Sequence, residues 1–269
     1  MGSLQPMQSR RLGLATLAVN SSLGFALGTV IALGVYQLGL IAAGLLFDRE
    51  PVWFPDRVEF LAAGSDAAWA GGVVLVLLAG WALAGIYRGG TQYDGTQLAV
   101  LWVTLHLFRE GSRALLVVPF SGDSDAAVAL AASDLPSSLN WVVAVLGAAG
   151  LLGVGLLAAP ALLRFARSTQ DLATRKARVA FVAILGIVAW AGGTLLTLPL
   201  LIPDGPSETL SLLPWSGVFL LFTLAASPEP REIDPVRPPV RLAWGVLLIL
   251  GALIATARMF LAGGWTVAS

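Results

Sequence analysis

Long apolar runs dominate the chain, and the short segments between them carry most of its charged residues. A helix needs about 20 apolar residues to cross the hydrocarbon layer of a membrane, because each residue adds about 1.5 Å to a layer about 30 Å thick. About seven runs reach or approach that length. They predict an all-α fold, a polytopic transmembrane helix bundle that forms a single integral membrane domain over residues 1–269. The expected spans cover about residues 16–47, 67–87, 98–120, 139–163, 179–202, 211–227 and 242–264.

The loops between these runs divide into two sets of unequal charge. One alternate set holds most of the basic residues, among them Arg175, Lys176 and Arg178, whereas the opposite set holds only Arg49 and Arg57. Cytoplasmic loops of membrane proteins carry the excess of Lys and Arg. The bias therefore predicts a cytoplasmic N-terminus and, with an odd number of spans, an outer C-terminus.

Composition agrees with a membrane location. The chain is 57% hydrophobic and 12% charged, with a mean hydropathy of +0.83, whereas soluble domains are about 25% charged. Arginine supplies all basic residues except Lys176, a bias typical of proteins from GC-rich prokaryotic genomes. We therefore expect a multi-pass protein of a prokaryotic cell (cytoplasmic) membrane.

The composition also argues against several partners and cofactors. Zero net charge without a basic stripe argues against nucleic acid as a partner. The absence of cysteine and the single histidine exclude thiolate metal sites, iron–sulfur clusters and paired-histidine haem, so no cofactor or metal is expected.

The third run, 98–120, carries the candidate site. His106, Arg109, Glu110 and Arg113 recur at helical spacing, so they share one stripe of a helix that is otherwise apolar. An ionisable side chain inside a membrane is costly unless it is paired or hydrated, and such residues face the interior of the bundle. The spacing allows a hydrogen bond between His106 and Glu110 and an ion pair between Glu110 and Arg113. It leaves Arg109 with no partner on its own helix.

The charges inside the predicted spans do not balance. Arg258, in the seventh run, adds a third arginine, and the spans contain only one glutamate. The candidate counter-charges are Asp204 or Asp66 turned inward, a lipid phosphate, an anionic solute, or carboxylates of a partner subunit. The alternative is a purely structural ion-pair cluster, with Arg113 and Arg258 extending to the outer interface.

Small residues predict close packing of helices. Gly24 and Gly28 in the first run, and Ala149 and Gly153 in the fourth, have the GxxxG-type spacing that lets helix backbones approach within one chain. The polar residues 20–22 of the first run are candidates for hydrogen bonds between helices.

Three functions fit this pattern. The first is binding or transport of an anionic or proton-coupled small solute or lipid at the His106/Arg109/Glu110/Arg113 stripe, with the lipid bilayer and an anionic small molecule or lipid headgroup as partners. The second is a non-catalytic structural subunit that uses the same charges against membrane partner subunits. The third is a membrane-embedded hydrolase with His106 as general base, although the sequence holds no catalytic motif and favours a protein without enzymatic activity.

One short stretch bears on the third function. The spacing of His106 and Glu110 faintly resembles the zinc helix of site-2-type intramembrane metalloproteases, and Asp204-Gly205 resembles their LDG motif. Leu107 stands where that family has its catalytic glutamate, and Glu110 where it has its second histidine. The resemblance therefore implies at most a degenerate, non-proteolytic relative.

Overall fold

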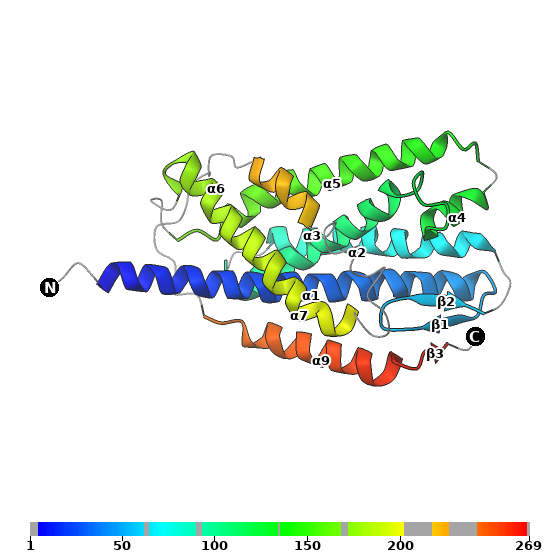
Figure 1. Ribbon diagram of the computed structural model, residues 1–269, viewed down its shortest axis with the longest axis horizontal. Coiled ribbons are helices and arrows are strands. Elements are labelled where there is room, and N and C mark those ends of the chain that lie inside the picture. The colour runs from blue at the N-terminus through cyan, green and yellow to red at the C-terminus, as the bar shows by residue number, and fades with distance from the viewer. Residues whose placement is uncertain are drawn as a thin grey trace.

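The computed structural model is a bundle of helices around the long helix α1, and it describes residues 5–61, 65–89, 93–133, 135–167, 172–201, 217–225 and 241–267 (Figure 1). The helices are α1 (Gln5–Leu46), α2 (Gly71–Gly89), α3 (Gly95–Leu116), α4 (Asp125–Ala131), α5 (Leu139–Leu163), α6 (Arg175–Ala183), α7 (Ala189–Leu201) and α9 (Trp244–Leu261). Residues 217–225 are also helical. The 3-10 helix η1 (Asp66–Ala70) leads into α2, and the π-helical turn η3 (Ile184–Val188) joins α6 to α7.

Among the described residues, five stretches of helix are long and apolar enough to cross a membrane, which supports a membrane-embedded protein. They are Gly13–Leu46, Asp66–Gly89, Leu139–Leu163, Arg175–Leu198 and Trp244–Leu261. These five correspond to the first, second, fourth, fifth and seventh predicted spans. The third predicted span is also a helix, α3, but its charged stripe leaves it outside the apolar set. Of the sixth, only residues 217–225 lie in the part of the chain that the structure describes.

The charged helix α3 lies in the interior because apolar helices surround it. It packs against α1, α2 and α5, and α1 in turn packs against α2, α7 and α9. Figure 1 shows α1 running the length of the molecule, with α3 between it and α5. The side chain of Asp94 caps the start of α3 by accepting a hydrogen bond from the backbone N–H of Gln97 at 2.9 Å.

The contact between α1 and α3 depends on small residues. A Cβ atom at Gly24 would lie 2.9 Å from Trp102 Cδ1, and one at Gly28 would lie 2.8 Å from the carbonyl oxygen of Trp102. The predicted pair Gly24 and Gly28 therefore packs within the chain, as the sequence indicates. Gly39 of α1 and Gly71 at the start of α2 approach each other in the same way, backbone against backbone.

The prediction that Ala149 and Gly153 of α5 form a close helix contact is wrong. Gly153 has nothing within 4 Å of an added Cβ, and Ala149 is exposed. The contact surface of α5 lies instead at Gly147 and Gly150, where an added Cβ would meet the backbone and side-chain oxygens of Ser112 on α3. The glycines of α5 are so frequent that spacing alone could not select the face that packs.

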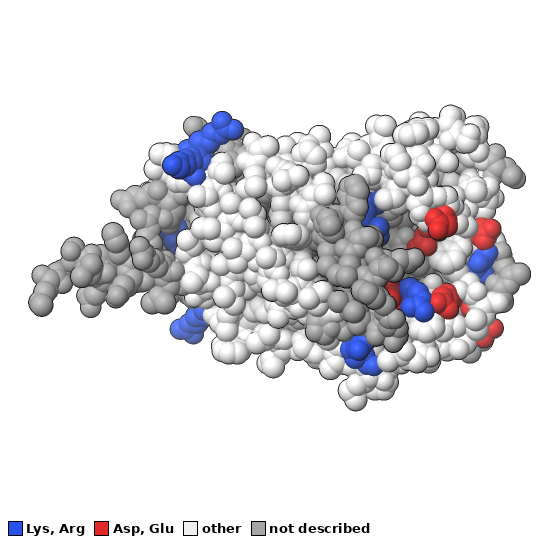
Figure 2. All heavy atoms as spheres, viewed as in Figure 1, with Lys and Arg blue, Asp and Glu red and all other residues white. Residues whose placement is uncertain are grey.

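A small sheet closes one end of the bundle and departs from the all-α expectation. Strand β1 (Pro51–Trp53) pairs antiparallel with β2 (Val58–Phe60) and with β3 (Trp265–Thr266), so the first connection of the chain meets its last residues. Strands of two or three residues are too short to show an alternating pattern in sequence. Asp and Glu side chains gather at this end on the face shown in Figure 2, whereas the charged side chains visible at the opposite end are Lys and Arg.

Candidate functional site

The stripe on α3 is buried where the sequence places it. His106 is fully buried, and Arg109 and Glu110 are 6% and 9% exposed. The side chain of Arg113, one turn further along, is 24% exposed and therefore lies at the edge of the interior. The four predicted residues thus form one continuous group, here called the α3 cluster.

Glu110 is the centre of the α3 cluster. Arg109 Nη2 donates to Glu110 Oε2 at 3.0 Å, and Arg113 Nε donates to Glu110 Oε1 at 3.0 Å. Arg113 Nη2 also bonds to the same Oε1. The predicted Glu110–Arg113 pair is therefore present. The expectation that Arg109 has no partner on its own helix is wrong, because its long side chain reaches the adjacent carboxylate.

The predicted hydrogen bond between His106 and Glu110 does not form. Both carboxylate oxygens of Glu110 face guanidinium groups, and both ring nitrogens of His106 lack a hydrogen-bond partner among the described residues. Rings surround the imidazole instead: the centroid of Phe25 lies 4.3 Å away at an interplanar angle of 89°. Trp102 and Phe219 lie 5.9 Å and 6.3 Å away. A neutral imidazole packs well in such surroundings, but its two nitrogens are left without a bond.

Arg109 has unused donors beside this imidazole. Its Nε and Nη1 atoms are buried and have no hydrogen-bond partner within the described ranges, whereas its Nη2 atom donates a hydrogen bond to Glu110. Residues three apart on a helix are neighbours, so the free donors of Arg109 and the free nitrogens of His106 belong to one local site. Buried polar groups are normally satisfied, and each exception calls for an explanation such as a bound ligand, ion or water.

A polar pair at the start of α4 adjoins the other end of the α3 cluster. The hydroxyl of Tyr36, on α1, donates to Asp125 Oδ2 at 2.8 Å. Burial raises the pKa of Asp125, whereas this hydrogen bond and the nearby guanidinium of Arg113 oppose the rise. Asp125 is therefore a counter-charge that the sequence did not identify, since it falls between the expected spans 98–120 and 139–163. Tyr36 offered one clue, because a tyrosine within an apolar run needs a partner for its hydroxyl.

The remaining predicted residues lie elsewhere. Arg258 is exposed in the last turn of α9, and Asp66 forms an ion pair with Arg49 at the sheet end of the bundle. Asp204 lies outside the described residues. Within the cluster the two arginines therefore face Glu110 and, near Arg113, Asp125, which is a smaller imbalance than the sequence suggested.

A second polar group in the interior is fully bonded. Trp102 Nε1 donates to Ser21 Oγ at 2.8 Å, and Ser21 Oγ donates to the carbonyl of Leu185 at 2.7 Å. Ser22 Oγ donates to the carbonyl of Val188 at 3.1 Å. Both acceptors lie in the π-helical turn η3, a geometry that leaves carbonyl groups free for such bonds. The predicted hydrogen bonds between helices are therefore present at Ser21 and Ser22, whereas Asn20 bonds to the backbone of Arg241 and Ala243, just before α9.

No protein-family model, curated protein or solved structure matches this chain at a significant level. In the described ranges, no group of three or more His, Cys, Asp or Glu side chains has the arrangement of a metal site. The site must accordingly be interpreted from its own chemistry.

Proposed function

We propose that this chain is a multi-pass membrane protein, with its N-terminus in the cytoplasm, that binds an anionic small solute or an acidic lipid headgroup at Arg109 and His106. The observation that carries the proposal is the pair of unbonded donors, Nε and Nη1, on the buried guanidinium of Arg109. A buried cation with unused donors is costly, and a carboxylate or phosphate oxygen would satisfy both its charge and its hydrogen bonds.

The distribution of counter-charges supports Arg109 rather than Arg113 as the ligand's partner. Glu110 is shared between both arginines, but Arg113 also has the carboxylate of Asp125 in its neighbourhood. Arg113 is in addition the more exposed of the two. Arg109 is thus the cation whose surroundings compensate it least.

The imidazole of His106 supports a ligand that carries a proton. A neutral imidazole has one N–H donor and one nitrogen acceptor, and neither ring nitrogen is bonded within the described residues. The acceptor nitrogen can therefore receive a hydrogen bond from the acidic proton of a ligand held on Arg109. Coupled movement of an anion and a proton across the membrane is the activity we propose for this arrangement.

The test is a thermal unfolding series on the purified protein in mild detergent, with inorganic phosphate, acetate and phosphatidylglycerol as probes. A ligand at 100 times its dissociation constant stabilises a protein by about 2.7 kcal/mol, which such a series resolves. We expect at least one probe to stabilise the wild type clearly more than it stabilises Arg109→Gln. Arg258→Gln is the matched control, because it removes the same charge from an exposed position.

Arg109→Lys keeps the positive charge but not the guanidinium donors, so it separates a loss of ligand binding from a loss of folding. An equal response of wild type, Arg109→Gln and Arg258→Gln would refute the site, and so would a wild type that responds to none of the three probes. Stoichiometric co-purification of another membrane chain would favour the alternative function, a structural subunit.

A further inference from the structure

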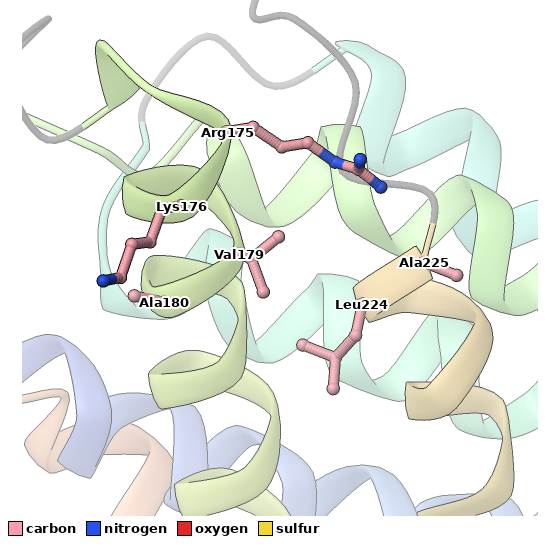
Figure 3. A pocket seen from close by; sticks show the side chains of 6 residues that line it. All are labelled: Arg175, Lys176, Val179, Ala180, Leu224 and Ala225. Carbon is pink, nitrogen blue, oxygen red and sulfur yellow. The ribbon is translucent and has the colours of Figure 1, made fainter.

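A groove opens at the end of the bundle near the N-terminus, between α6 and the helix 217–225 (Figures 1 and 3). Its volume is about 780 Å³. It is lined by Arg175, Lys176, Val179 and Ala180 of α6 and by Leu224 and Ala225 of the facing helix. None of these residues belongs to the α3 cluster, so the groove is a separate site.

The two cations of the groove are free to bind a ligand. Arg175 and Lys176 are exposed, and neither forms an ion pair or side-chain hydrogen bond in the part of the chain that the structure describes. Figure 3 shows Arg175 extending from the start of α6 across the gap towards Ala225, with Val179 and Leu224 projecting into the gap, whereas Lys176 points away from the facing helix. Arg175 therefore borders an apolar floor, and Lys176 adds a second positive charge on the adjoining face of α6.

The order of these residues along α6 matches a membrane interface. Arg175 begins the apolar stretch Arg175–Leu198, which is long enough to cross a membrane. Val179 and Ala180 follow the two cations by one helical turn and therefore lie about 6 Å deeper along the helix. The cations thus stand at the level of lipid headgroups and the apolar floor at the level of the upper acyl chains.

We infer that this groove binds one anionic phospholipid. The phosphate pairs with Arg175 at the rim, the charge of Lys176 adds to the attraction from the adjoining face of α6, and the upper part of an acyl chain packs against Val179 and Leu224. A free phosphate would leave the apolar floor unoccupied. A zwitterionic lipid would bring its own positive charge close to the two cations, so charge complementarity favours an acidic headgroup.

The test is native mass spectrometry of the full chain in mild detergent, titrated with phosphatidylglycerol or phosphatidylcholine. Each Lys or Arg near a membrane surface contributes a factor of about five in affinity for acidic lipid. We expect the first phosphatidylglycerol to bind the double variant R175Q/K176Q about 30-fold more weakly than it binds the wild type. Phosphatidylcholine should bind wild type and variant alike.

The double variant R88Q/R241Q is the matched control, because it removes two exposed cations at the same end of the bundle but outside the groove. It should retain the affinity of the wild type. The inference is overturned if R88Q/R241Q weakens binding as much as R175Q/K176Q, since the attraction would then be diffuse. It is also overturned if phosphatidylglycerol affinity is unchanged in R175Q/K176Q, or if inorganic phosphate displaces the bound lipid as well as a second phospholipid does. Arg109→Gln leaves this lipid in place, so failure here and failure of the interior site are distinguishable.

Discussion

Replacing Gly28 by alanine tests the contact that brings α1 against the candidate site. The added Cβ would lie 2.8 Å from the carbonyl oxygen and 3.0 Å from the carbonyl carbon of Trp102, and it would overlap Cδ2 of His106. Side chains can rotate away from such an overlap, but the backbone of α3 cannot. The two helices must therefore separate locally, or the imidazole must leave its aromatic surroundings.

The magnitude follows from two opposing effects. Alanine is favoured over glycine inside a helix by about 1 kcal/mol. Forcing an extra carbon into a packed interior costs about 1–3 kcal/mol, and the rigid backbone at Trp102 places this substitution at the upper end. Gly34 is the matched control on the same helix, because an alanine there meets nothing within 4 Å. The helix-propensity gain is common to both variants, so their difference isolates a packing cost of about 3 kcal/mol.

The assay is reversible unfolding in detergent, by heat or denaturant, of wild type, Gly28→Ala and Gly34→Ala. A difference of about 3 kcal/mol places the midpoint temperature of Gly28→Ala about 6–12 °C below that of Gly34→Ala for a chain of this size class. Gly34→Ala should unfold at or slightly above the wild-type temperature. If the two alanine variants unfolded at the same temperature, α1 and α3 could not be in backbone contact at Gly28.

Two further perturbations probe the ends of the bundle. Since burial raises the pKa of Asp125, its protonated form contributes stability that is complete below about pH 4 and is lost as the pH rises through the folded-state value. From about pH 4 upward, the free energy of unfolding should therefore fall less in Asp125→Asn than in the wild type. Equal slopes of this free energy against pH would contradict the burial of the carboxyl. Asn20 is fully buried, donates to the carbonyl of Arg241 at 2.9 Å and accepts from the N–H of Ala243 at 2.9 Å. Asn20→Ala should cost about 1–3 kcal/mol and speed amide hydrogen exchange at the start of α9 but not in α5, and unchanged exchange at Ala243 would refute the bond.

The sequence predicted best what depends on local geometry. The length of an apolar run determines whether a helix can cross a membrane, and the described part of the chain contains five such helices. The spacing of three and four residues likewise determines that His106, Arg109 and Arg113 share one face of α3, whatever surrounds it. The sheet could not be predicted in this way, because β3 pairs with β1 across almost the whole chain.

The partners of the candidate site could not be predicted because they depend on the rotation of neighbouring helices. Phe25 and Phe219 come from segments far apart in the sequence, and nothing in their own spacing indicates that both face His106. Arg109 and Glu110 are adjacent, and adjacent residues on a helix point about 100° apart. Only the long, flexible guanidinium side chain lets them bond, and its conformation is decided by the packing around it.

The polar groups buried next to the α3 cluster can be compared with it to decide whether the cluster is merely structural. Ser21 and Trp102 are as deeply buried as His106, and Ser22 is buried as well; the two hydroxyl groups and the indole N–H each have a hydrogen bond. The fold therefore satisfies its polar groups one turn away from the cluster, and it bends a helix into a π-turn beside them to supply the acceptors. A cluster retained only for packing should be equally complete. Among the described residues, Tyr87, Gln97 and Arg178 each leave one buried polar atom without a hydrogen bond, whereas His106 and Arg109 together leave four on one turn of α3. This concentration is the reason for proposing that a group from outside the chain completes the interior there.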